Sequence, residues 1–391
     1  MPSKIQYVAP PSATADEAAH MGLACGCGRV FPLLRRGVHH GWLGEQARAE
    51  MGSTAECKAA WRAAEAVLLP GLVASEIPPH SANLAASAQL MEQVLDGEAC
   101  EELFDQLAYV ARYGRRFELL SGVYDEGEPQ AIATVEFDVL EDGEPIDEVV
   151  WVKASWLSFE DDDASLRFRF SHGHDLFDDV AVDFSRQKTA GELCDALFPE
   201  SQILTGSPAL RQRLSEILSV PELAFVERIV YFNAPNGGAQ FHHDVERGHL
   251  GVVFAQLTGR TGWLALPKMQ LVDEIERFVA RPDSTDLLKA VLPAAAHRKK
   301  LLAKIADRPT LIAWMDEANN GPLEALLNRV PAFTQQLVER GNAFVVEPGD
   351  VLLLSQHEID ACAWHSVFCL DDYPGEALSF AVRAVASQGV A

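Results

Sequence analysis

The stretch Gln240-Phe241-His242-His243-Asp244 decides how this chain is interpreted, together with Trp364-His365 much later in the sequence. His242 and Asp244 form an H-x-D pair. Because residues i and i+2 of an extended segment point to the same side, one strand end presents an imidazole nitrogen and a carboxylate oxygen to a single ion. His365 completes the set of three predicted metal ligands. His243 points away and is expected to pack or to support the site.

Two histidines and one carboxylate on one side of an ion leave the opposite positions open to oxygen and to an organic ligand. This donor set is typical of non-haem Fe(II) oxygenases. An H-x-D pair alone occurs often by chance. The pattern is more specific here because a strand and a turn precede the pair, Pro348-Gly349-Asp350 begins a later strand, and Trp364-His365 begins the next. We therefore favour a metal site over a coincidental grouping of core and turn residues.

The composition limits the partners of the chain. Its 391 residues are enough for a large core and two or three structural units. With 32 Lys and Arg against 57 Asp and Glu, the net charge is −25. Such a surface repels phosphate backbones and anionic lipids, so we expect neither nucleic acid nor a membrane as a partner. We expect a small molecule, an amino acid or a peptide as substrate, and the helical regions offer a face for a homodimer.

The seven cysteines are scattered, and the first twenty residues have no apolar segment of the kind found in secretory signals. We therefore expect a cytoplasmic protein with free thiols. Cys25 and Cys27 resemble half of a metal-binding knuckle, but no second pair follows at the spacing of a zinc ribbon. A glycine-rich turn is the favoured interpretation of this segment.

The hydrophobic pattern divides the chain into three parts. Residues 1–115 are predicted to be mostly helical, because apolar residues between about 42 and 113 recur at three- and four-residue steps. Residues 116–224 change to a period of two with acidic turns, which predicts a β-meander and then short helices that pack on the core or complete it. Residues 225–391 combine strands with a helical block at 268–341, which we interpret as an insertion into a β fold.

Two further groups of histidines are alternative candidates for metal ligands. His39 and His40 precede the first predicted helices without a nearby carboxylate, which favours a loop or surface role. His172, His174 and Asp175 surround a glycine between predicted strands, which favours a turn.

The segments around the predicted ligands resemble the Jumonji-C, cupin-like oxygenases. His242-x-Asp244, residues 252–260 and Trp263-x-x-x-Pro267 resemble the first half of their core. Residues 347–352, Trp364-His365 and residues 378–382 resemble the second half. The resemblance covers about residues 225–268 and 343–385. It implies an α+β protein whose core is a double-stranded β-helix, a jelly roll that holds Fe(II) near its mouth and uses 2-oxoglutarate.

The residues expected to bind 2-oxoglutarate depart from the family pattern. The family usually has Ser or Thr three residues before the first ligand histidine, where this chain has Ala239. Its usual lysine is replaced by Thr261, and its usual asparagine by Val252. These changes remove a hydroxyl, an ammonium and an amide, and a dicarboxylate still requires a charge-assisted partner.

Arg383 is the predicted replacement, because it shares a face of the last predicted strand with Ser379. Other 2-oxoglutarate oxygenases use an Arg and Ser pairing on that strand. The alternative is an exposed arginine at a strand end. Tyr231 and Asn233, on one face of an earlier strand, are expected to line the pocket with Gln256.

Three functional hypotheses follow. The favoured one is an Fe(II)- and 2-oxoglutarate-dependent oxygenase that hydroxylates or otherwise oxidises an amino acid, a peptide or a small metabolite. The second is a metal-dependent oxygenase or oxidase without 2-oxoglutarate, whose substrate chelates the iron. The third is a non-enzymatic cupin-like binding protein. The third is disfavoured because burying a carboxylate between two histidines is costly without a cation.

Overall fold

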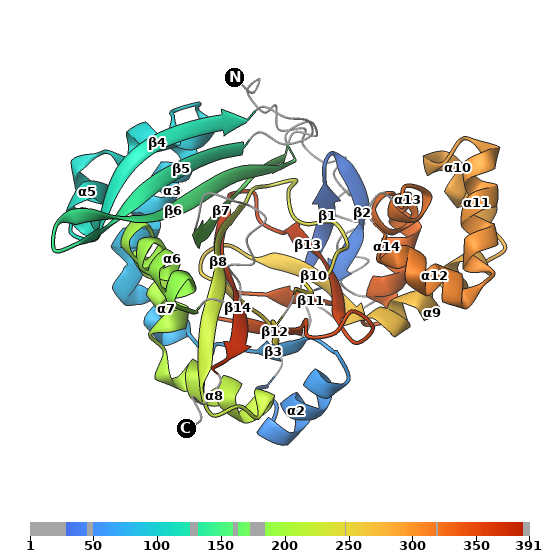
Figure 1. Ribbon diagram of the computed structural model, residues 1–391. Helices are drawn as coiled ribbons and strands as arrows, with labels where there is room; N and C mark the ends of the chain where they lie inside the picture. The colour runs from blue at the N-terminus through green and yellow to red at the C-terminus, as the bar shows by residue number, and fades with distance from the viewer. Residues whose placement is uncertain are drawn as a thin grey trace.

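The structure is a computed structural model that describes residues 29–44, 50–125, 132–158, 163–172, 184–246, 248–317 and 320–385. It combines helices with antiparallel sheets (Figure 1). Cys25, Cys27, His174 and Asp175 lie outside the described residues. The other five cysteines are free and buried.

A nine-stranded antiparallel sheet runs through the molecule in the order β3-β12-β9-β14-β8-β7-β6-β5-β4. Its strands are β3 Val67–Leu69, β4 Phe117–Asp125, β5 Ile132–Glu141, β6 Glu144–Ser158, β7 Asp163–His172, β8 Leu223–Asn233, β9 Gly251–Gln256, β12 Val351–Ser355 and β14 Gly375–Ala384. The predicted meander is β4–β7. It continues the core sheet, because β7 pairs with β8 with Phe168 opposite Val230.

A second, three-stranded sheet has the order β11-β10-β13, with β10 Thr261–Pro267, β11 Ala343–Val346 and β13 Ala363–Cys369. The segment before Asp244 runs along β13 as an additional extended element. Ala239 and Val367 exchange two backbone hydrogen bonds, and so do His242 and His365. From β8 to β14 the chain passes repeatedly between the two sheets: the segment before Asp244 separates β8 from β9, whereas β10 and β11, on either side of the helical block, are consecutive strands of the same sheet.

Helices α9–α14 separate β10 from β11 and form a lobe of their own, drawn in orange in Figure 1. They are α9 Lys268–Val279, α10 Ser284–Val291, α11 Ala295–Ile305, α12 Arg308–Met315, α13 Pro322–Arg329 and α14 Pro331–Glu339. Their apolar faces share a core that includes Phe278, Trp314 and Phe333. Lys268 ties this lobe to the sheet region, since its buried ammonium lies 2.7 Å from Asp316 and 3.0 Å from Asp360.

The N-terminal region differs from the predicted helical pattern at its start. Residues Val30–Arg35 and Val38–Gly44 form a hairpin, β1 and β2, that the apolar spacing had not indicated. Alternate residues of β1 are buried, which is a strand pattern too short to stand out in a long helical region. The prediction of a loop or surface role for His39 and His40 was wrong: both lie in β2, and His40 is buried.

The remaining helices cover the nine-stranded sheet. They are α2 Thr54–Arg62, α3 Ser81–Leu95, α4 Cys100–Phe104, α5 Leu107–Tyr113, α6 Phe184–Leu197, α7 Gln202–Thr205 and α8 Pro208–Leu218, with short 3₁₀ turns at Ala74–Glu76, Pro78–His80 and Pro199–Ser201. Aromatic rings fill the layer between these helices and the sheet. The ring of Phe168 packs against Phe198 and Phe232, with centroid distances of 5.1 and 6.0 Å. Such rings supply much of the buried apolar surface of a core.

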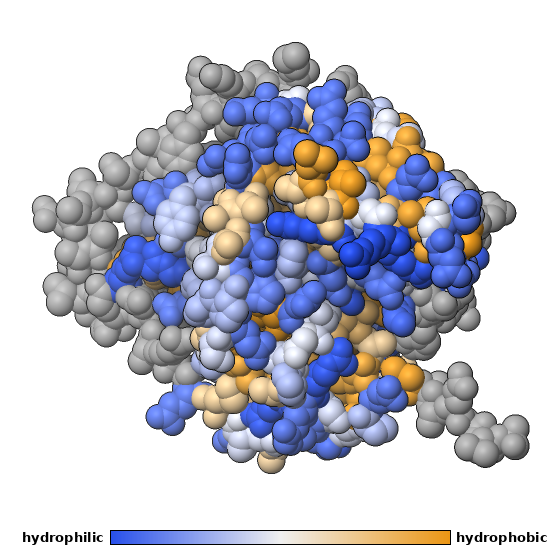
Figure 2. All heavy atoms as spheres, turned by 90° about the vertical axis from the view of Figure 1, so that its left-hand side faces the viewer, coloured by the Kyte–Doolittle hydropathy of each residue, from blue (hydrophilic) through white to orange (hydrophobic). Residues whose placement is uncertain are grey.

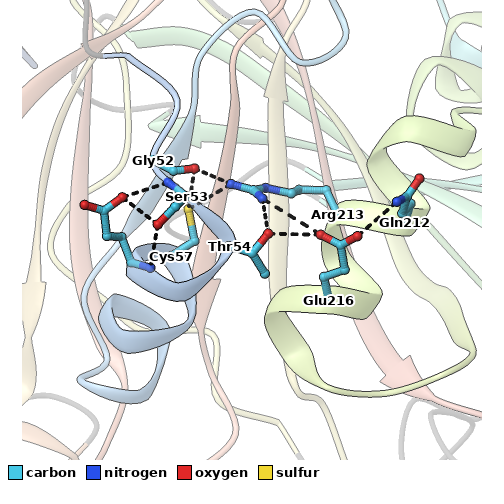
Figure 3. A network of polar contacts seen from close by, with 8 residues as sticks. Gly52, Ser53, Thr54, Cys57, Gln212, Arg213 and Glu216 are labelled. Atoms are coloured by element: carbon cyan, nitrogen blue, oxygen red, sulfur yellow. Dashed lines mark hydrogen bonds and ion pairs between the residues drawn. The ribbon is translucent and has the colours of Figure 1, made fainter.

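A polar clasp joins α2 to α8 (Figure 3). Ser53 caps α2 in a capping box with Glu56. Arg213 of α8 donates to the Gly52 carbonyl and to the Thr54 hydroxyl, and Thr54 in turn donates to Glu216 at 3.0 Å. The clasp holds the first N-terminal helix beside the end of the sheet.

Polar side chains cover much of one face of the molecule (Figure 2). The face shown in Figure 2 is largely hydrophilic, with apolar side chains in small separate groups. Among the described residues, none of the helices combines the length and apolar character that crossing a bilayer requires.

Candidate metal centre

The candidate metal centre forms where the H-x-D segment pairs with β13. Gly238, at φ +130°, precedes this pairing, and a Cβ atom there would lie 2.1 Å from the Val367 carbonyl oxygen. Only glycine permits so close an approach at this backbone angle. The pairing then sets His242 directly opposite His365.

The three predicted ligands lie together. Their candidate ligand atoms are all within 4.8 Å of one another. His242 Nε2 lies 3.5 Å from Asp244 Oδ1, and His365 Nε2 lies 3.4 Å from Asp244 Oδ2. Atoms bound at about 2.1 Å to one ion are separated by about 3.0 to 3.5 Å, so both distances fit a shared metal.

Neighbouring groups orient each ligand. His242 Nδ1 donates to the Gln240 carbonyl at 2.7 Å, which leaves the Nε2 lone pair free to bind a metal. The backbone N–H of Asp244 donates to the side-chain oxygen of Gln356 at 3.2 Å, and the amide nitrogen of Gln356 donates to the Ala363 carbonyl at 2.9 Å. One glutamine therefore links the segment carrying Asp244 to the strand carrying His365.

The charges of the three groups suit a divalent cation. Burial and the neighbouring His242 lower the pKa of His365 to about 4, so its imidazole is neutral at physiological pH. Although burial opposes ionisation, the two imidazoles hold the pKa of the Asp244 carboxyl well below its usual range. The Asp244 carboxylate raises the pKa of His242, although burial disfavours the charged form of that imidazole. A metal would displace that proton and use the same lone pairs.

The ligands open onto a pocket between the two sheets. Its other lining residues are Tyr231, Asn233, Ala239, Val252, Phe254, Trp263, Leu354, Val367 and Ser379. Among the predicted pocket residues, Tyr231, Asn233 and Ser379 thus lie beside the ligands. Their hydroxyl and amide groups are polar points in an otherwise largely apolar wall.

Gln256 and Arg383 are not part of this lining. Gln256 is fully buried and holds a turn, because its amide nitrogen donates to the carbonyls of Thr258 and Glu376 at 2.7 and 3.3 Å. Arg383 lies on β14, the last strand, as predicted, but its guanidinium packs against Gly248. Arg383 is buried rather than exposed.

Thr261 is the residue at the position where the sequence resemblance led us to expect a lysine. It supports His365, one of the three candidate ligands, through Trp263. Its hydroxyl donates to Gln256 at 2.8 Å and accepts from the indole N–H of Trp263 at 2.9 Å. The indole ring stacks on His365 with a centroid distance of 5.4 Å. Thr261 therefore fixes the ring against which His365 rests.

Arg167 of β7 lies on the strand next to Tyr231 of the pocket wall, a position that the sequence did not reveal. It lies opposite Tyr231, and its Nε donates to Ser155 Oγ at 2.7 Å. Burial raises the pKa of Tyr231, and the Arg167 guanidinium acts on that hydroxyl in the opposite direction. The strand carrying Arg167 was predicted. Its pairing with β8 joins segments far apart in the sequence, and no local pattern indicates such a pairing.

Comparisons with known proteins identify no family. No family model matches the chain, and no curated protein matches it in sequence. A solved oxidoreductase of the 2OG-Fe(II) oxygenase family from Burkholderia pseudomallei is similar at 11% identity and a TM-score of 0.32, over 87% of this chain and 96% of that one. Two structures of YcfD from Escherichia coli, one described as a ribosomal oxygenase, show 15% and 16% identity and TM-scores of 0.21 and 0.24. In both cases the match covers 73% of this chain but only 44% and 46% of YcfD.

Proposed function

We propose that this protein is a non-haem Fe(II)-dependent oxygenase acting on an amino acid, a peptide or a small metabolite. The observation that carries the proposal is the convergence of His242, Asp244 and His365 at the wall of one pocket. Two imidazoles and a carboxylate on one side of an ion leave its remaining coordination positions facing that pocket. When bound, Fe(II) would supply the activation of molecular oxygen.

We also infer that the core is a double-stranded β-helix. The support is the repeated passage of the chain between two sheets that together line the pocket, with β8, β9, β12 and β14 in one sheet and β10, β11 and β13 in the other. Tyr231 and Ser379 come from the first sheet, and Trp263 and His365 come from the second. A ligand pocket between two such sheets is a common feature of jelly-roll proteins.

The other residues of the pocket prepare the site for chemistry. Gln356 holds the two ligand-bearing segments at a fixed distance, and Trp263 restricts rotation of His365. Val252 and Phe254 contribute apolar surface to the wall beside the ligands. A substrate bound there would meet an ordered set of donors next to a largely apolar wall.

We propose 2-oxoglutarate as the cosubstrate, with Arg167 as the partner of its far carboxylate. Among the described lining residues there is no lysine or arginine. The positively charged group that pairs with this carboxylate must therefore come from a residue next to the lining. Arg167 acts electrostatically on both Tyr231 and His242. Arg383, the candidate indicated by the sequence, acts instead on His249, whose pKa burial and this guanidinium lower to about 4.

A second candidate is an oxygenase that does not use 2-oxoglutarate and whose substrate chelates the iron directly. It is favoured by the two apolar lining residues, Ala239 and Val252, at positions where the resembling family has polar groups that hold the cosubstrate. The two candidates differ in one observable property, which is the binding of 2-oxoglutarate to the iron-loaded protein.

The test is an anaerobic titration. The purified protein is loaded with Fe(II), 2-oxoglutarate is added, and the weak visible charge-transfer band of the chelate is recorded. We expect a band in the wild type, a strongly weakened one in Arg167→Met, and an unchanged one in Arg383→Met. Tight iron binding without a band would exclude 2-oxoglutarate and favour the second candidate. A protein that binds no Fe(II) would contradict both.

A further inference from the structure

Helix α11 concentrates positive charge on a protein that is otherwise strongly acidic. Between residues 287 and 306 the sequence has no Asp or Glu and five basic residues, Lys289, Arg298, Lys299, Lys300 and Lys304. The whole chain has 57 Asp and Glu against 32 Lys and Arg, so the charge of this stretch is opposite to that of the protein. Four of the five basic residues lie on α11, which Figure 1 shows with α10 at the edge of the lobe farthest from the meander.

The packing of α11 directs two of these lysines to solvent. Leu301 is fully buried in the core of the lobe, which fixes the opposite side of the helix outward. Lys299 and Lys300 are exposed on that side, and exposed alanines, Ala296 and Ala303, lie one turn before and one turn after them. Alanine is too short to cover a neighbouring ammonium group. We call these four residues the basic face of α11.

The surroundings do not neutralise the basic face. Lys299 and Lys300 form no ion pair with a residue of the described ranges. The ammonium of Lys300 lies 6.0 Å from the ring centroid of Trp314, a contact that leaves its positive charge in place. By contrast, Arg281 of the same lobe lies 2.8 Å from Asp283. The two lysines therefore keep charges that an anionic ligand can pair with.

The extent of the basic face limits the size of the ligand. Exposed acidic residues lie on both sides of the stretch in the chain, Asp286 on α10 and Asp307 after α11. With 11 residues, α11 is about 16 Å long, and an extended polypeptide of about five residues spans the same distance. A long nucleic acid strand or an anionic membrane would also meet the acidic remainder of the protein, which repels it.

We propose that the basic face of α11 binds a short acidic segment of a polypeptide partner. Carboxylates of this segment pair with Lys299 and Lys300, and charge complementarity is the argument for this occupant. The contact lies on the outer side of the lobe and uses none of the residues that line the metal pocket. It is therefore independent of the proposed oxygenase function.

The test measures binding to the full-length protein by fluorescence anisotropy, with fluorescein-labelled pentaglutamate and pentaglutamine as probes. We expect pentaglutamate to bind about tenfold tighter than pentaglutamine at low ionic strength, and this preference to be largely lost at about 0.5 M salt. Lys299→Glu/Lys300→Glu should weaken pentaglutamate binding by about tenfold or more, because it replaces attraction by repulsion. Lys299→Gln/Lys300→Gln, which only removes the charges, should weaken it less.

Lys58→Glu/Arg62→Glu on α2 is the matched control, because it changes the charge of the protein by the same amount at a distant helix. It should bind pentaglutamate as the wild type does. Thermal unfolding of each variant verifies that the fold is intact. Equal affinity for the two peptides, no saturable binding, or an equal loss in the α11 and α2 variants would overturn the proposal.

Two other anionic probes form a separate arm of the experiment, an oligothymidylate of about twenty nucleotides and vesicles that contain phosphatidylserine. Weaker binding of both than of pentaglutamate supports a polypeptide partner. Tighter binding of either probe, if lost in Lys299→Glu/Lys300→Glu, would overturn the proposal and assign the basic face to nucleic acid or to a membrane. Because no metal is required, the result does not depend on the outcome of the iron titration.

Discussion

Asp244 is the central residue of the proposed metal centre, because its two carboxylate oxygens lie near two different imidazoles. Oδ1 lies 3.5 Å from His242 Nε2, and Oδ2 lies 3.4 Å from His365 Nε2. A carboxylate in this position compensates the positive charge of a bound ion and fixes the spacing of the other two ligands. Asparagine at this position would keep the volume but lose the charge.

A second buried carboxyl, Glu376, is expected to control how stability depends on pH. Glu376 and Glu200 are both buried, and burial together with Glu200 raises the pKa of Glu376 well above 4.5. The folded state therefore keeps a proton that the unfolded state releases. The stability that this proton contributes is fully present below about pH 4.5 and is lost as the pH rises toward the folded-state pKa.

Glu376→Gln should remove this dependence, because glutamine carries a permanent donor and no charge. We expect the variant to match the wild type near pH 4 and to be more stable near pH 8, by up to about 1.4 kcal/mol for each pH unit of the shift. Urea unfolding at both pH values measures the difference. Glu118→Gln on the exposed face of β4 is the control. If the difference in unfolding free energy between Glu376→Gln and the wild type were the same at both pH values, the raised pKa of Glu376 would be contradicted.

At the scale of elements, the contact between the H-x-D segment and β13 is the feature that assembles the site. Gly238 permits it, because a Cβ atom there would meet the Val367 carbonyl at 2.1 Å. Gly97 has a similar positive φ but nothing within 4 Å of such a Cβ atom. Alanine substitutions at the two glycines therefore distinguish the effect of backbone strain from the effect of a steric collision.

Gly97→Ala should cost about 1–3 kcal/mol of unfolding free energy from strain alone. Gly238→Ala should cost clearly more and should also weaken Fe(II) binding, because the collision displaces the strand that carries His365. Chemical unfolding and anaerobic iron titration measure the two effects. Equal losses in the two variants, with iron affinity unchanged in both, would show that the close approach is not required.

The β1–β2 hairpin reinforces the same contact through Arg35. This guanidinium is buried and donates to the Ala239 carbonyl at 2.7 Å, to the Ser366 hydroxyl at 2.5 Å and to Asn328 Oδ1 at 3.4 Å. Asn328 Oδ1 also accepts from the backbone of Phe241 at 2.8 Å. One side chain thus joins the hairpin, both ligand-bearing segments and α13.

Arg35→Met should weaken Fe(II) affinity by about 10- to 100-fold, the effect typical of losing a group that supports metal ligands. The ligands themselves remain, so some iron binding should persist. Arg29→Met is the control, since Arg29 is exposed and packs over Phe31 of the same hairpin. Unchanged iron affinity in Arg35→Met would show that the hairpin is only a structural cover.

For the molecule as a whole, the sequence indicated three residues that the structure brings together as candidate ligands, and the alternation of helical and β regions. The H-x-D spacing and the Trp364-His365 pair are short sequence patterns, so they can be recognised without knowledge of the fold. The meander and the helical block at 268–341 were visible for the same reason. The short hairpin carrying Arg35 was not, because its few alternating residues lie in a region dominated by helical spacing.

What the sequence could not reveal were contacts between distant segments. Arg167 lies opposite Tyr231 only because β7 pairs with β8, and Arg383 packs against Gly248 although it lies on the predicted strand. The direction of a long side chain at a strand end depends on the loops around it, which no periodicity describes.

The most direct test of the central claim is anaerobic equilibrium dialysis of the full-length protein against Fe(II). We predict about one bound Fe(II) per chain in the wild type and a loss of more than about 100-fold in affinity in both Asp244→Asn and His365→Ala. Asp286→Asn, on the exposed side of α10, should bind as the wild type does. Wild-type affinity in both ligand variants would contradict the account, because the iron would then be bound elsewhere.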